Sequence, residues 1–200
     1  MSKQYLQILK EHLEHAWRRG ERQLEKALPA IRREGCLKFS AFASTCLLCP
    51  DKILLDGEEL LGPEGILIAL YARHVEQKLP QLHPLQSFKE LPGSAPYQGA
   101  FEARAQQILV PHVLAIEQHK EQLAKRFSGR LNPDAPSGDF SFTLYPLPRI
   151  PLYYIFYLPD DEFPAAVTCL FAADACSHLP VDALADVAEY TAVRIFALLK

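Results

Sequence analysis

The chain has 200 residues, of which 49% are apolar and 22% are charged. This composition excludes a disordered chain, and a chain of this length buries roughly 70% of its unfolded surface, so folding requires neither disulfides nor metals. Lysine and arginine number 21 against 24 aspartates and glutamates, a net charge of −3 with no dense basic stripe. We therefore expect no nucleic-acid partner.

The first residues are polar and charged and do not resemble a secretory signal. The longest apolar run, residues 150–158, is interrupted by Pro151 and is too short to cross a bilayer. Reduced thiols explain an odd number of cysteines most simply. The five are Cys36, Cys46, Cys49, Cys169 and Cys176. We therefore expect a cytoplasmic protein with no membrane partner and no required cofactor.

The first part of the chain predicts a helix followed by a hairpin and a second helix. Apolar and small residues recur at steps of three and four over residues 1–28, the pattern of an amphipathic helix. We assign residues 1–35 to this N-terminal helix, packed on the domain that follows. Residues 36–48 and 53–57 predict two strands joined by turn residues 49–52. Pro63 and Glu64 indicate a helix start, and Pro80 ends that helix.

The second part of the chain predicts helices around a meander. Residues 97–127 show helical spacing in two stretches, broken near Pro111. Phe140, Phe142 and Leu144 alternate with polar residues, and the runs 152–157 and 166–171 supply two more strands. A helix begins near Val181. The prediction is an α+β fold, in which an antiparallel sheet made of the N-terminal hairpin and the C-terminal meander packs with helices, and residues 36–200 form a single domain.

Four segments together resemble one known family, and they lie at residues 66–71, 88–101, 147–152 and 160–171. The family is a bacterial domain of unknown function that is common in anaerobes and in sulfate or metal reducers. Some members carry a four-cysteine iron–sulfur segment like that of corrinoid proteins, which implies a link to anaerobic one-carbon or cofactor metabolism. This chain lacks that segment and has Ala172 where relatives usually show an acid. The resemblance implies no established activity.

The C-x-x-C spacing of Cys46 and Cys49 is a weak signal for metal binding or redox chemistry. A structural zinc site usually has four ligands, commonly from two such pairs. Cys169 and Cys176 are seven residues apart, with His178 nearby, and do not form a matching pair. Buried free thiols are therefore the favoured interpretation, and we expect no metal.

Asp160, Asp161 and Glu162 place three carboxylates side by side between two apolar strands. Adjacent acids can bind a hard cation or act as general acid and base. They also form solvated turns in which aspartate accepts hydrogen bonds from local backbone amides, and we favour this interpretation. Glu162 adjoins Phe163, which we expect to be buried.

Two arginines are candidates for binding an anion or for forming an ion pair within the protein. Arg149 is the one positive charge in the apolar stretch 147–152, and it could bind an anionic ligand or pair with Asp161 or Glu162 across the hairpin. Arg104 follows Tyr97 on the next helix and admits the same two interpretations. In both cases the ion pair is favoured.

The sequence ranks three functions. The first is a non-catalytic domain that holds a small ligand, a cofactor or a partner protein in a pocket between sheet and helices, with Arg149 or Tyr97 at its mouth. The second is an interaction module that forms homo-oligomers through the N-terminal helix. The third is an enzyme in which Asp161, Glu162 and Arg149 converge in one cleft.

Overall fold

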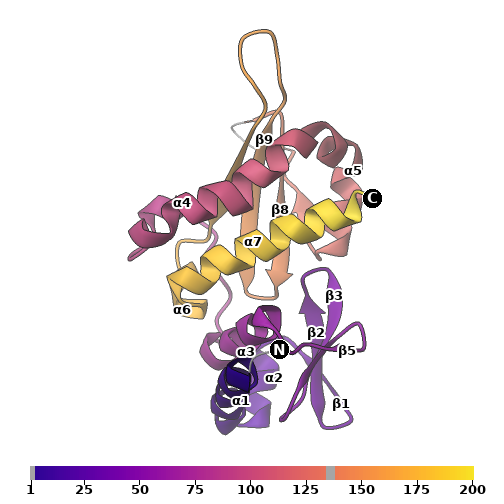
Figure 1. Ribbon diagram of the computed structural model, residues 1–200, viewed down its shortest axis with the longest axis vertical. Coiled ribbons are helices and arrows are strands. Elements are labelled where there is room, and N and C mark those ends of the chain that lie inside the picture. The colour runs from indigo at the N-terminus through magenta and orange to yellow at the C-terminus, as the bar shows by residue number, and fades with distance from the viewer. Residues whose placement is uncertain (1–2, 134–137) are drawn as a thin grey trace.

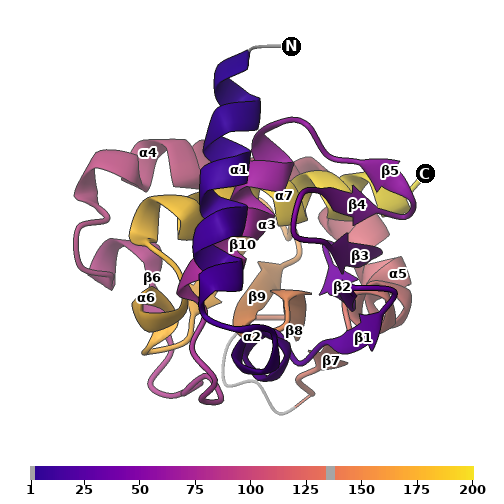
Figure 2. The same ribbon diagram turned by 90° about the horizontal axis from the view of Figure 1, so that it is seen from below.

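The N-terminal region forms two helices, α1 (Lys3–Arg18) and α2 (Glu21–Ala27), where the sequence predicts one continuous helix. They are seen in a computed structural model that describes residues 3–133 and 138–200. The helix breaks at Gly20, whose φ of 88° is a left-handed conformation that glycine adopts without steric cost. Helix α1 packs along α3 (Pro63–His74), as Figure 2 shows.

An antiparallel sheet follows α2 and has the strand order β1-β2-β3-β4-β5. Its strands are β1 (Ile31–Arg33), β2 (Cys36–Ala41), β3 (Ser44–Leu48), β4 (Ile53–Leu55) and β5 (Glu58–Glu59). The predicted single strand over residues 36–48 is wrong, because the chain reverses inside it at Phe42 and Ala43. The expected two-stranded hairpin is therefore a five-stranded meander.

The turn between β2 and β3 joins this sheet to the rest of the molecule. Phe42 and Ala43 both have positive φ, 49° and 61°, which residues other than glycine, asparagine and aspartate seldom adopt. The Phe42 side chain is fully buried, and its ring centroid lies 5.9 Å from that of Tyr190. Its backbone N–H donates to the carbonyl of Pro146 over 2.7 Å. Burial of the ring offsets the strain of the turn.

The second antiparallel sheet has the strand order β6-β10-β9-β8-β7. The predicted three-stranded meander is confirmed as its centre, and short strands extend both edges. The strands are β6 (Gln86–Ser87), β7 (Arg130–Leu131), β8 (Phe140–Leu147), β9 (Ile150–Tyr157) and β10 (Ala166–Phe171). Inward-facing rings of Phe142, Tyr154 and Phe156 pack against one another in its core.

Helices cover one face of this second sheet, as Figure 1 shows for α7 and the stretch from α4 to α5. The helices are α4 (Gln98–Phe101), α5 (Val113–Arg126), α6 (Ala175–His178) and α7 (Val181–Leu198). Between α4 and α5 the chain forms a π-helical turn over Glu102–Gln106 and then a 3-10 segment that contains Pro111, so the predicted break is confirmed. The predicted α+β class is also confirmed. None of the described helices is long and apolar enough to span a membrane.

Candidate functional site

The five predicted site residues fall into three separate places. Arg149 lies in the turn between β8 and β9, whereas Asp161 and Glu162 lie in the connection from β9 to β10. These two turns are at opposite ends of β9, whose eight residues span about 27 Å at roughly 3.4 Å per residue. Tyr97 and Arg104 belong to the helical layer. The enzyme hypothesis requires Arg149 to lie close to Asp161 and Glu162. The structure does not bring them together.

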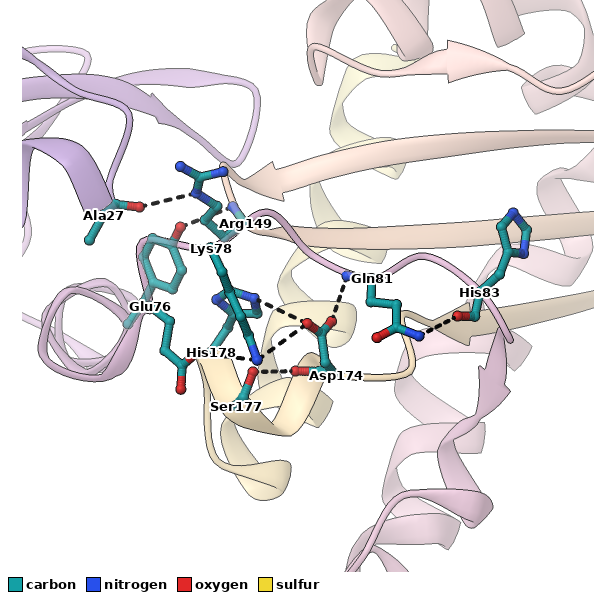
Figure 3. Close-up of polar contacts among 10 residues, drawn as sticks. Ala27, Glu76, Lys78, Gln81, His83, Arg149, Asp174, Ser177 and His178 are labelled. Carbon is teal, nitrogen blue, oxygen red and sulfur yellow. Dashed lines mark hydrogen bonds and ion pairs between the residues drawn. The ribbon is translucent and has the colours of Figure 1, made fainter.

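Arg149 is buried at the junction between the two sheets, with 9% of its surface exposed. Figure 3 shows its guanidinium facing the end of α2, where Nε donates to the Ala27 carbonyl and Nη2 to the Lys26 carbonyl, each over 3.4 Å. Its backbone N–H donates to the Tyr71 hydroxyl over 3.0 Å. The predicted ion pair with Asp161 or Glu162 is wrong. The positive charge instead stabilises the negative C-terminal end of α2.

The connection from β9 to β10 is a solvated turn, as favoured from the sequence. Asp160 Oδ1 accepts hydrogen bonds from the backbone N–H groups of Glu162, over 2.9 Å, and of Phe163, over 2.7 Å. The bond from Phe163, followed by that from Glu162, lowers the pKa of Asp160. The expected burial of Phe163 is wrong, because 66% of this side chain is exposed. Glu162 is exposed as well.

Tyr97 and Arg104 line a hollow of about 310 Å³ between the α4 region and α7. Arg104 Nη1 lies 3.4 Å from Glu189 Oε2, so the ion pair favoured for this residue is confirmed, with a partner on α7. Asp182 and Asp186 line the same hollow. Desolvation, together with the nearby carboxylates of Glu189 and Asp182, raises the pKa of Asp186. The hollow therefore carries more negative than positive charge.

The C-x-x-C residues do not form a pair of free thiols. Cys49 is joined to Cys36 by a disulfide, and Cys46 is a buried free thiol whose pKa is raised by burial. The register of the hairpin explains the pairing, because Leu37 opposite Leu48 places residue 36 opposite residue 49. The expectation of five reduced thiols is wrong for these two, and it no longer supports a cytoplasmic location. No group of three or more His, Cys, Asp or Glu side chains in the described residues could hold a metal.

The number of free thiols tests the disulfide between Cys36 and Cys49. Alkylation of the unfolded chain, purified without reductant, is expected to modify the three cysteines Cys46, Cys169 and Cys176, and prior reduction is expected to expose all five. Replacing Cys36 and Cys49 by serine should lower the free energy of unfolding by about 2–3 kcal/mol, because the crosslink restricts the unfolded chain. Cys176→Ser is the control, since this exposed thiol is free. Modification of all five cysteines before reduction would contradict the pairing.

A polar cluster that the sequence did not indicate lies around the buried His178 (Figure 3). His178 is fully buried, and neither ring nitrogen has a hydrogen-bond partner. Its Nε2 lies 3.9 Å from Asp174 Oδ2, and Lys78 Nζ lies 3.6 Å from the same oxygen. Asp174 Oδ1 accepts from the backbone N–H of Gln81 over 2.8 Å. Desolvation lowers the pKa of His178, so this imidazole is neutral at pH 7.

Hollows at the junction of the two sheets adjoin one another and form what we call the junction groove. Two hollows of about 530 and 320 Å³ share Pro29, Phe39 and Ser40 in their walls. Residues on β2 and β3 line one side, and residues at the end of α5 and of β8, or just after these elements, line the other. The side chains that matter chemically are Lys38, Phe39, Ser40, Thr45, Arg126 and Tyr145.

The charges of the junction groove favour an anion. Lys38 and Arg126 line the groove, and Asp56 is its one acidic lining residue. The Asp56 carboxylate is already engaged, because its Oδ1 accepts the backbone N–H of Thr45 over 2.8 Å, and that bond, first among its causes, lowers the pKa of Asp56. The two cations are 88 positions apart in the sequence, and no local motif connects them. Sequence reasoning therefore missed this site.

A comparison with known families places most of the chain in a family. The family described as "Domain of unknown function (DUF3786)" matches residues 22–194, a range that begins inside α2 and covers both sheets. This agrees with the resemblance to a family of unknown function. No curated protein and no solved structure matches the chain.

Proposed function

We propose that this chain, which belongs to the DUF3786 family of domains of unknown function, is a non-catalytic binding domain that takes a small organic anion in the junction groove. The observation that carries the proposal is the presence of Lys38 and Arg126 in the walls of one groove whose single acidic residue is engaged by the backbone. A guanidinium and an ammonium bind carboxylates and phosphates through charge-assisted hydrogen bonds.

The other walls support a ligand with an apolar or aromatic body. Tyr145 offers a ring surface beside Phe39, which is 7% exposed, and Ser40 and Thr45 offer hydroxyls that accept or donate hydrogen bonds. Ligand sites commonly combine apolar walls with a few placed polar groups and lie where two structural units meet. Neither histidine nor cysteine lines the groove, so the Ser–His and Cys–His pairs that commonly supply an activated nucleophile are missing from its walls. This favours binding over catalysis.

Isothermal titration with phenyl phosphate, benzoate and inorganic phosphate tests the proposal. Phenyl phosphate is expected to bind more tightly than inorganic phosphate, because its ring reaches the apolar wall. Lys38→Glu and Arg126→Glu are each expected to weaken binding about tenfold or more, the loss of one charge-assisted contact of about 1.5–3 kcal/mol. Lys10→Glu, at an exposed position of α1, makes the same charge change away from the groove and should leave binding unchanged.

Equal binding by Lys38→Glu and the parent chain, or no binding of any of the three probes, would contradict the proposal. Thermal melting gives a second readout, because a ligand at 100 times its Kd adds about 2.7 kcal/mol to the free energy of unfolding. The link to anaerobic metabolism and the cytoplasmic location stay predictions from the sequence.

A further inference from the structure

The connection from β9 to β10, residues 158–165, is an acidic finger that projects from the body of the molecule, as Figure 1 shows at the top of the view. Asp160, Asp161 and Glu162 lie in it and are all exposed. Phe163 follows them, and with 66% of its surface exposed it is one of the most exposed large apolar side chains of the described chain. Exposed aromatic residues on a projecting loop are typical of interaction sites.

The finger is held in one shape by its own hydrogen bonds. The Asp160 backbone N–H donates to the Phe163 carbonyl over 3.0 Å, while the Asp160 carboxylate accepts from the N–H groups of Glu162 and Phe163. These bonds fix Phe163 outside the body with Asp161 beside Glu162. A loop that is already ordered loses little conformational entropy on binding.

We propose that the acidic finger of one copy of this chain occupies the junction groove of a second copy. The inference rests on the proposed function, because the finger offers the chemistry that the groove takes: carboxylates next to an aromatic ring. Asp161 and Glu162 would face Lys38 and Arg126 of the second copy, and Phe163 would pack on its apolar wall. Charge complementarity of this kind steers association and fixes which surfaces meet.

The finger cannot reach the groove of its own chain. Tyr145 and Pro148, at the β8–β9 end of the second sheet, line the groove, whereas the finger leaves the opposite end of β9, about 27 Å away along the strand. Contact between a finger and a groove is therefore contact between two different surfaces of two copies. Two copies that exchange fingers reciprocally form a closed dimer, whereas a head-to-tail arrangement forms a ring or an open chain, and in each case the mass rises with concentration.

Sedimentation velocity over a wide range of concentrations tests the inference on the intact chain. The parent is expected to gain mass as its concentration rises, and to lose that mass in high salt, which screens exposed charges. Phe163→Ala is expected to raise the dissociation constant about tenfold or more, since buried aromatic anchors dominate interface energies. Leu79→Ala is the matched control, because this side chain is 77% exposed and lies outside both surfaces.

Charge exchange identifies the two surfaces. A groove variant, Lys38→Glu with Arg126→Glu, and a finger variant, Asp161→Lys with Glu162→Lys, should each be monomeric alone, because finger and groove then carry like charges. Mixing the two variants restores opposite charges at every contact and should restore association. Association of Phe163→Ala equal to that of the parent, a parent that stays monomeric at every concentration, or no recovery on mixing would overturn the inference.

The outcomes separate this inference from the proposed function. A monomeric parent that binds phenyl phosphate overturns only the contact between copies. A parent that associates through finger and groove, but neither binds phenyl phosphate nor dissociates when it is added, keeps the contact and overturns the small-ligand proposal.

Discussion

Replacing Phe42 by alanine is expected to lower the free energy of unfolding by about 3–5 kcal/mol, measured by urea denaturation. The Phe42 ring is fully buried at the tip of the β2–β3 hairpin and lies against Tyr190 of α7. Truncation would leave a cavity where the first sheet meets the second half of the molecule. The backbone of this residue, with φ of 49°, would also lose the packing that holds it in a left-handed conformation.

Phe163→Ala is the matched control, because it makes the same chemical change at the tip of another hairpin. That side chain is 66% exposed, so its loss should change the free energy of unfolding of the monomer by no more than about 0.5 kcal/mol. Equal effects of the two substitutions would contradict the role assigned to Phe42. A large effect of Phe42→Ala with an unchanged urea m-value would show that both halves still unfold together.

The elements with strong local patterns could be predicted from the sequence. Alternation at Phe140, Phe142 and Leu144 identifies β8, and Pro63 marks the first turn of α3. The β2–β3 turn could not be predicted, because Phe42 and Ala43 are neither glycine, asparagine nor aspartate, the residues that usually mark a two-residue turn. A contact with Pro146, distant in the chain, determines that turn.

The candidate sites depend on contacts that no local pattern encodes. Arg149 was correctly singled out as an unusual charge, but its partners are carbonyls at the end of α2, more than 120 positions earlier. The disulfide depends in the same way on one long-range fact, the register of β2 on β3. With the turn placed at residues 42 and 43, Cys36 and Cys49 become opposite neighbours, and the pairing follows.

Replacing His178 by leucine is expected to raise the free energy of unfolding at pH 7 by about 1–3 kcal/mol, because it removes a buried polar ring whose nitrogens make no hydrogen bonds. Asp174 and Lys78 keep each other as partners, at 3.6 Å, when the ring is lost. Urea denaturation of parent and variant measures the difference. His15→Leu, at an exposed position on α1, serves as the control and should change stability by less than about 0.5 kcal/mol.

We also expect the stability of the parent and that of His178→Leu to depend differently on pH. Desolvation lowers the pKa of folded His178 below 6.5, so the unfolded chain binds its proton more tightly than the folded chain. The parent therefore loses stability as the pH falls below about 6.5, and this loss should be smaller in His178→Leu. His12 and His74, whose pKa values burial also lowers, contribute equally to both proteins and cancel in the comparison. A variant that is less stable than the parent at pH 7 would mean that His178 gains more from Asp174 than burial takes away. The same loss in acid for both proteins would mean that folding does not lower the pKa of His178.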